Sequence, residues 1–144
     1  MNVISSHPMS QHAAILFAND AFYIAFQGRD IDAMREAWSE RENITCIHPG
    51  WPTLNGRREV MSSWKAILSN AYNPSIECRH ATAHLAGDVA YVLCYEVIPQ
   101  GFLVSTNIFA KENGIWRMIH HQSGPAPSDF GEEEEENGPL ARVQ

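Results

Sequence analysis

Few side chains in this sequence of 144 residues are placed to transfer a proton inside an apolar environment, and Glu96 is the foremost. Within residues 89–128 only Glu96 and Glu112 are acidic, and Glu112 adjoins a turn that water reaches. Abstraction of a proton next to a carbonyl group requires a carboxylate or an imidazole in an apolar pocket, where burial raises a carboxyl pKa toward neutrality. We therefore predict Glu96 as a general base. The alternatives are a partner of Arg79 or Arg117, or a residue at the pocket rim.

One histidine joins Glu96 as a catalytic candidate, and four other residues are candidates for ligand contact. His121 is the second candidate for acid–base chemistry, because an imidazole titrates near neutral pH; the alternative is a hydrogen-bonded histidine in a polar cavity. His48 precedes a Pro-Gly-Trp turn and is predicted to line a cavity mouth, or else to bond to the turn backbone. Trp51 and Trp64 would form flat apolar pocket walls, or pack in the core. Asn107 needs a hydrogen bond among its apolar strand neighbours, from a ligand or from a neighbouring side chain.

Metal and cofactor sites are not predicted. His80 and His84 lie on one face of a predicted strand, but about 13 Å apart at about 3.3 Å per residue, which is too far to share a zinc ion. The pair Cys46 and His48 supplies only two ligands. The sequence also lacks a phosphate-binding glycine loop, a dinucleotide fingerprint and a Gly-x-Ser-x-Gly elbow. We therefore predict neither a metal nor a cofactor.

The charge of the chain lies mainly near its C-terminus. The formal net charge is −7, and Asp129, Glu132–Glu136 and Arg142 together contribute −5 of it, so the rest of the chain is nearly neutral. A neutral body does not attract a phosphate backbone, and nucleic acid is not an expected partner. Five consecutive glutamates cannot pack together, which predicts an acidic disordered tail over residues 128–144.

The length fits one domain, which we place at residues 11–127 after a flexible N-terminus at residues 1–10. The apolar runs are too short to span a membrane, and no secretion signal precedes the domain. An odd number of cysteines, Cys46, Cys78 and Cys94, argues against a disulfide framework. We predict a cytoplasmic protein with buried free thiols and no membrane partner.

Three helices are predicted ahead of a sheet. The apolar spacing over residues 11–27 is helical. Asp30 caps a second, short helix. Residues 43–47 are β-branched and apolar and form a predicted strand. Gly56 then opens a third helix, which Asn73-Pro74 closes.

The second half of the sequence alternates apolar and polar residues in four segments separated by turn signals. The predicted strands span residues 75–86, 89–98, 102–112 and 115–123. Short turns, with Asn113-Gly114 as the strongest hairpin signal, make these strands an antiparallel meander. Helices followed by a meander define an α+β fold. Both faces of the sheet are apolar, so we expect the helices to cover one face and a second copy to cover the other, as a homodimer through the sheet.

The sequence resembles the SnoaL-like branch of the nuclear transport factor 2-like superfamily over roughly residues 13–125. The resemblance is carried by Phe22-Tyr23-x-Ala25-Phe26, Ile47-His48-Pro49-Gly50-Trp51-Pro52, Gly56, Val60, Ser63-Trp64, Ile67, Thr106-Asn107-Ile108-Phe109 and Gly114-x-Trp116-Arg117-Met118-Ile119-His120-His121. Gln122 departs from the pattern, because many SnoaL-like relatives carry a third consecutive histidine there.

The resemblance implies a cone in which N-terminal helices pack on a curved, mostly antiparallel sheet around an internal cavity. Members of this superfamily are commonly dimers, and they include isomerases, cyclases, dehydratases and non-enzymatic binding or assembly modules. The chain is therefore expected to bind a small molecule. It would do so as an enzyme acting on an apolar carbonyl compound, or as a non-catalytic ligand-binding or assembly module.

By the same resemblance, Arg117, His121 and Ser123 look into the cone together with Glu96 and Asn107, unless a β-bulge reverses part of the strand. The last two strands are also similar to the association domain of calcium/calmodulin-dependent protein kinase II, in which pocket arginines bind carboxylates. Those positions fall here on Glu96, Asn107 and Ser123, so capture of an anionic ligand is not expected. The predicted ligand-binding residues are His48, Trp51, Trp64, Asn107 and Arg117.

Overall fold

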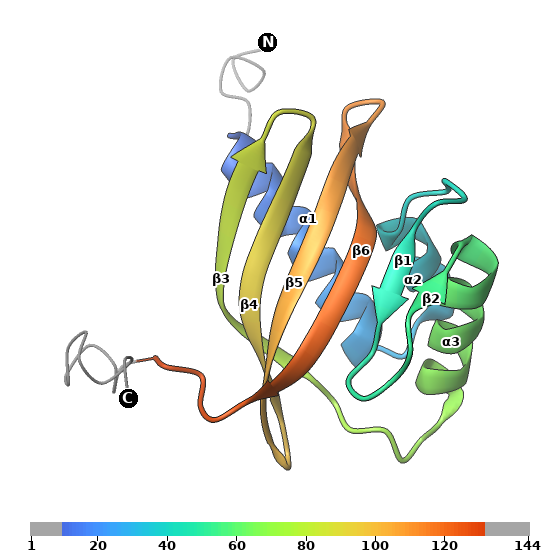
Figure 1. Ribbon diagram of the computed structural model, residues 1–144, viewed down its shortest axis with the longest axis vertical. Helices are drawn as coiled ribbons and strands as arrows, with labels where there is room; N and C mark the ends of the chain where they lie inside the picture. The colour runs from blue at the N-terminus through green and yellow to red at the C-terminus, as the bar shows by residue number, and fades with distance from the viewer. Residues whose placement is uncertain (1–9, 132–144) are drawn as a thin grey trace, which may run out of the picture.

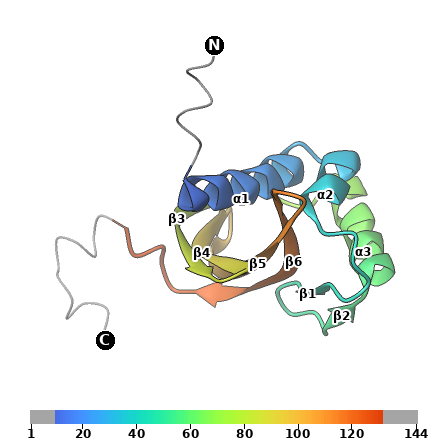
Figure 2. The ribbon, with the colours of Figure 1, turned by 90° about the horizontal axis from the view of Figure 1, so that it is seen from above.

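A computed structural model describes residues 10–131, in which one long helix crosses the inner side of a curved six-stranded sheet (Figures 1 and 2). The elements are α1 (Gln11–Gln27), α2 (Ile31–Ala37), β1 (Thr45–Ile47), β2 (Leu54–Asn55), α3 (Arg57–Ser69), β3 (Glu77–Ala86), β4 (Val89–Ile98), β5 (Gly101–Glu112) and β6 (Ile115–Ala126). The sheet order is β2-β1-β6-β5-β4-β3. The predicted α+β class is confirmed. No helix within residues 10–131 is long and apolar enough to cross a membrane.

Helix α1 begins and ends where the sequence predicts. The Ser10 hydroxyl accepts a hydrogen bond from the Ala13 amide at 3.0 Å, which satisfies one of the free amides of the first turn. Ile15 and Phe22 are fully buried on the face of α1 that meets the sheet. Two polar side chains, Asn19 and Tyr23, are buried on the same face. The helix therefore brings hydrogen-bonding groups, as well as apolar area, to the inner side of the sheet.

The two shorter helices lie at the β1–β2 end of the sheet (Figure 2). The Asp30 carboxylate caps α2 by accepting a hydrogen bond from the Ala33 amide at 3.0 Å, as predicted. Gly56 opens α3 with a φ of 91°, a backbone conformation that favours glycine, and its amide donates to the Ile44 carbonyl at 2.8 Å. Val60 and Trp64 of α3 are fully buried in the core.

Strands β3 to β6 form the predicted antiparallel meander. The turn between β5 and β6 uses Asn113 and Gly114, which both have positive φ, as a two-residue hairpin requires. Strand β6 runs past the predicted end at Ser123 and reaches Ala126. Pro125 is tolerated there because β1 ends beside Gln122, so its missing amide faces no partner strand on that side.

A β-bulge in β6 changes which residues face the cone. Ile108 pairs with His120 whereas the next residue of β5 pairs with Met118, which leaves Ile119 as an extra residue. Met118 is consequently fully buried on the inner side, and Arg117 turns outward and donates a hydrogen bond to the Glu36 carbonyl. The prediction that Arg117 faces the cavity is therefore wrong, because strict alternation fails at the bulge.

The core offers a matched test on a single helix. Phe22 is fully buried against the rings of Tyr23, Trp38 and Trp64, whereas Phe17 is 66% exposed. We expect Phe22→Ala to lower the free energy of unfolding by about 3–5 kcal/mol, because it removes a large buried ring and leaves a cavity. Phe17→Ala should change it by less than about 0.5 kcal/mol. Urea denaturation of both variants checks this, and equal losses would contradict the assigned buried face.

Candidate functional site

A pocket of about 410 Å³ opens between the inner side of the sheet, the end of α1, and α3 with the loops around it. Its walls are mainly apolar, and no lysine or arginine is among the residues that line it. Its titratable lining residues are His48, Glu96 and His121. A hollow with apolar walls and a few convergent polar groups is the usual form of a small-molecule site.

The Glu96 carboxyl group is almost completely buried in the pocket wall. Its two oxygens accept hydrogen bonds from the hydroxyls of Tyr23 at 2.5 Å and of Ser123 at 2.8 Å. Burial raises the pKa of Glu96, and these hydrogen bonds lower it by a smaller amount, so the net direction is upward. Arg79 pairs with Glu77 and Asp129, and Arg117 donates to the Glu36 carbonyl. Neither of these two arginines is therefore the partner of Glu96.

Tyr23 links α1 to this carboxyl group. Its hydroxyl also accepts a hydrogen bond from the Asn107 amide at 3.2 Å and lies 3.3 Å from Cys94 Sγ. Burial, and then the nearby Glu96 carboxylate, raise the pKa of Tyr23 well above its ordinary value. The phenol therefore stays neutral and serves Glu96 as a hydrogen-bond donor.

Asn107 orients the His121 ring of β6, and Asn19 in turn orients Asn107. Asn107 donates through Nδ2 to Asn19 Oδ1 at 2.8 Å, and its Oδ1 lies 2.6 Å from His121 Nδ1. This orientation places the imidazole proton on Nδ1 and leaves a lone pair on Nε2. Nε2 has no hydrogen-bond partner within residues 10–131, while the ring lines the pocket. Burial, with a smaller contribution from His120, lowers the pKa of His121 to about 3.

His48 is fixed in the opposite tautomer. Ser63 donates its hydroxyl proton to the Val60 carbonyl at 2.7 Å, so it accepts from His48 Nε2 at 2.9 Å. Burial, and then His121, lower the pKa of His48 to about 3. The ring is thus bonded to a helix side chain, while the His48 carbonyl accepts a hydrogen bond from the Trp51 amide at 2.9 Å within the turn.

Two tryptophans flank the His48 ring. The centroid of the Trp51 ring lies 4.8 Å from that of His48, and Trp51 is 43% exposed at the open side of the pocket. The centroid of the Trp64 ring lies 4.7 Å from that of His48, and Trp64 is fully buried. Trp51 therefore closes part of the mouth, and Trp64 serves both as core and as pocket wall.

The structure brings together most of the residues predicted from the sequence. Five of them line one pocket: His48, Trp51, Trp64, Glu96 and His121. Asn107 lies behind His121, and neighbouring side chains satisfy its amide. Sequence reasoning missed Asn19 and Tyr23. Both lie on the helical stripe defined by Ile15 and Phe22, and a polar residue on an otherwise apolar stripe is the signal that would have found them.

No three side chains among His, Cys, Asp and Glu in residues 10–131 come together in a group that could hold an ion. Cys46, Cys78 and Cys94 are free thiols. The pocket itself presents the Glu96 carboxyl and the imidazole rings of His48 and His121.

This architecture, a curved sheet closed by helices around a pocket, is shared with solved structures of the nuclear transport factor 2-like class. A protein from Streptomyces avermitilis described as a dehydratase of that family is 27% identical, with a TM-score of 0.71 over 78% of this chain and 94% of that one. A protein from Thiobacillus denitrificans described as a calcium/calmodulin-dependent protein kinase type II association domain is 28% identical, with a TM-score of 0.70 over 76% of this chain and 92% of that one.

The chain belongs to the SnoaL-like domain family, whose model matches residues 15–127. The F-box protein SKIP8 of Arabidopsis thaliana is 28% identical over 112 residues, which are 76% of this chain. The chain spans about half the length of that relative, 48%. The expected resemblance to the family is confirmed.

The two buried histidines predict a pH dependence of stability. Their folded pKa values of about 3 lie below the ordinary value of 6.5, so the unfolded chain binds more protons between these limits. Their contribution to stability is present above pH 6.5 and is lost as the pH falls toward 3. Each histidine should lower the free energy of unfolding by about 1.4 kcal/mol per pH unit over this window.

Urea denaturation at a series of pH values measures this slope. Replacing His121 by Gln should make the slope shallower, whereas replacing the exposed His12 by Gln should leave it unchanged. A slope that is the same in all three proteins would show that His121 is not buried in its neutral form.

Proposed function

We propose that this domain binds an uncharged, mainly apolar carbonyl compound and that Glu96 moves a proton at the carbon next to the carbonyl group. The observation that carries the proposal is the buried Glu96 carboxyl in the wall of an apolar pocket. Burial raises the pKa of Glu96 in the direction of neutral pH. A general base takes up and returns a proton most efficiently when its pKa lies near the working pH. Tyr23 and Ser123 hold the carboxyl in one orientation.

The charge of the pocket supports an uncharged ligand. No cation lines the pocket, and both lining histidines are neutral at pH 7 because their pKa values are about 3. A carboxylate or phosphate would lose its hydration without gaining a counter-charge. The lone pair of His121 Nε2 instead suits a hydroxyl or N–H group of a neutral ligand. The dehydratase description of a structural neighbour at 27% identity supports the same chemistry.

Replacing Glu96 by Gln tests the catalytic role. The amide keeps the size of the side chain but cannot take up the proton, so turnover should fall about 10²-fold or more. Substrates are found first by a thermal-shift screen of small carbonyl compounds, because a bound ligand raises the melting temperature. Glu77→Gln, on the exposed start of β3, is the matched control and should keep full turnover. Equal turnover in parent and Glu96→Gln would rule out this mechanism.

One observation favours a non-catalytic binding module as the second candidate. Both oxygens of Glu96 already accept hydrogen bonds from the protein, so the carboxyl can serve as a structural centre. A neighbour at 28% identity is described as an association domain. This candidate predicts saturable binding without turnover in the parent protein, whereas the enzyme predicts turnover that Glu96→Gln removes.

We also propose that a second copy of the chain covers the outer face of the sheet. Tyr91, Leu93 and Val104 lie on β4 and β5 on the side away from α1, and each is 38–42% exposed. A sheet that is apolar on both faces requires cover on each, and a two-fold partner supplies it.

The outer face gives a direct test of the dimer. Leu93→Lys places a charge in the middle of the face and should convert the dimer to a monomer in sedimentation velocity. Tyr72→Lys, at a side chain that is 95% exposed in the loop before β3, is the control and should stay dimeric. A dimer that survives Leu93→Lys would place the interface elsewhere.

A further inference from the structure

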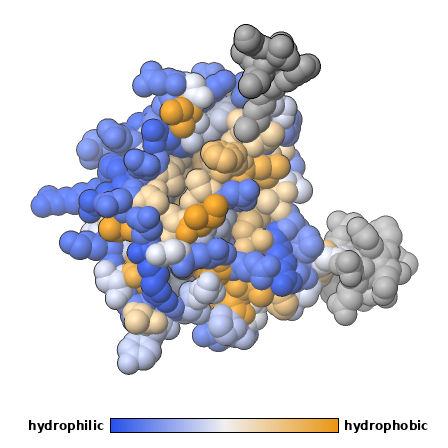
Figure 3. All heavy atoms as spheres, turned by 180° about the vertical axis from the view of Figure 1, so that it is seen from behind, coloured by the Kyte–Doolittle hydropathy of each residue, from blue (hydrophilic) through white to orange (hydrophobic). Residues whose placement is uncertain are grey.

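A groove of about 530 Å³ between α2 and α3 brings cations together on a domain that is nearly neutral outside its acidic C-terminal residues. It is lined by Arg35, Arg57, Arg58, Met61, Ser62 and Lys65, without an acidic residue. Four of the ten lysines and arginines of the chain thus line one groove, although the net charge of the chain is −7. Hydrophilic side chains gather over this end of the molecule, on the left of Figure 3. We refer to these six residues as the basic groove.

The basic groove differs from the rest of the described surface because three of its four cations lack partners within residues 10–131. Arg57 donates to the carbonyls of Ser39 at 2.6 Å and Arg35 at 3.2 Å. The side chains of Arg35, Arg58 and Lys65 are exposed and form no hydrogen bond or ion pair with any residue of 10–131. In this described range, every other lysine or arginine has a polar partner: Arg29, Arg41, Arg79, Lys111 and Arg117. Three free cations that share one groove point to an anionic partner.

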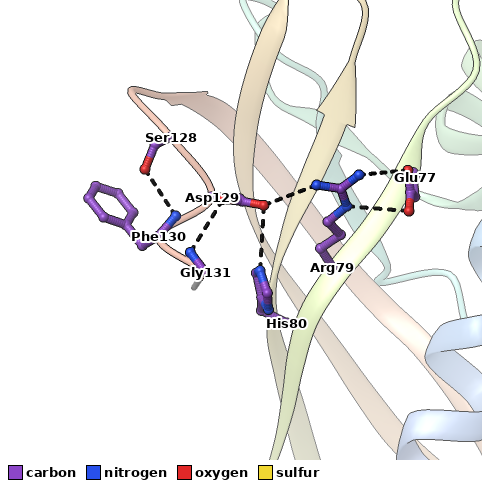
Figure 4. Close-up of polar contacts among 7 residues, drawn as sticks. All are labelled: Glu77, Arg79, His80, Ser128, Asp129, Phe130 and Gly131. Carbon is purple, nitrogen blue, oxygen red and sulfur yellow. Dashed lines mark hydrogen bonds and ion pairs between the residues drawn. The ribbon is translucent and has the colours of Figure 1, made fainter. Parts of the chain in front are cut away.

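The described chain ends at the opposite end of the sheet, against β3 and just before the acidic run in the sequence. Asp129 accepts a hydrogen bond from Arg79 of β3 at 3.2 Å and lies 3.5 Å from His80 (Figure 4). The Phe130 ring lies 6.0 Å from that of Tyr95 on β4. Residues 128–131, which the sequence analysis assigned to the tail, thus lie against β3 and β4. The glutamates Glu132–Glu136 follow immediately in the sequence.

The described chain ends on the far side of the molecule from its own basic groove. Five strand spacings of about 4.8 Å separate β3 from β2, about 24 Å, and α3 lies beyond β2. Five extended residues span at most about 18 Å from Gly131. Figures 1 and 2 both show the end of the described chain and α3 on opposite sides of the molecule.

We propose that the basic groove binds the acidic run Glu132–Glu136 of a second copy of the chain. Five negative charges match a groove of four positive ones, and the partner segment is present at the same concentration as the groove. The contact is head-to-tail, since it joins different surfaces on the two copies. It therefore closes into rings, of which a reciprocal pair is the smallest, or continues as open chains. It is also distinct from the proposed dimer through the sheet, which buries apolar area.

Salt separates this contact from an apolar one, because the Debye length falls from about 10 Å at 0.1 M salt to about 3 Å at 1 M. We expect sedimentation velocity of the full chain to show association that grows with protein concentration at low salt. The apparent association constant should fall about tenfold or more between about 0.05 M and 0.5 M NaCl. Any dimer through the sheet should remain at high salt.

Two complementary variants test the partners of the contact. A groove variant carries Arg35→Gln, Arg58→Gln and Lys65→Gln, and a tail variant carries Gln in place of all five residues of Glu132–Glu136. Each alone should lose the salt-dependent association, whereas an equimolar mixture should regain it as 1:1 pairs, because only the groove of the tail variant and the tail of the groove variant remain intact. The control Arg41→Gln, Lys111→Gln, Arg117→Gln removes the same charge outside the groove and should associate like the parent.

Three outcomes would overturn the proposal. They are association that the groove variant retains, loss of association to the same extent in the control, and a mixture that stays unassociated. A fluorescent single-stranded oligonucleotide tests the other class of anion. If the groove variant loses binding to that probe while salt-dependent self-association of the parent is absent, the groove is a nucleic-acid site and the head-to-tail contact is wrong.

Discussion

The buried carboxyl of Glu96 constrains the whole domain. A carboxyl group removed from water is costly unless hydrogen bonds replace its hydration, and here Tyr23 of α1 and Ser123 of β6 replace it. These bonds require one helix and two strands to meet in a single register. Asn107 extends the requirement, because it joins Tyr23 to His121 and Asn19. The polar centre thus fixes α1 on the sheet while keeping apolar side chains from filling the space, and the pocket follows from that arrangement.

The fold was largely predictable because local signals agreed with one another. The bounds of α1 followed from its apolar spacing, and α2 followed from the cap at Asp30. The meander followed from alternation and from Asn113-Gly114. The bulge at Ile119 was not predictable, because it depends on how β5 and β6 pair and not on either strand alone. The two residues of β2 carried no pattern long enough to detect.

Most residues of the pocket could be predicted from the sequence, but their protonation states could not. Glu96 could be predicted because acidic residues are scarce along these strands, and the fold buries this one. The protonation of His121 and His48 depends on partners that lie 14 and 15 residues away, Asn107 and Ser63. Both partners act as acceptors, so the opposite tautomers follow from which ring nitrogen faces the acceptor, Nδ1 in His121 and Nε2 in His48. Spacing in the sequence carries no information of that kind.

The titratable and charged groups of the molecule lie in two different environments. Inside, the pocket has no fixed cation and its histidines are neutral, so hydrogen-bond geometry decides what fits. Outside, three cations that lack a partner among residues 10–131 line one groove at the β2 edge, and Asp129 bonds to Arg79 at the β3 edge. Water and salt screen the second set and leave the first almost untouched. In the proposed head-to-tail contact, salt therefore weakens the association and leaves the protonation of the pocket unchanged.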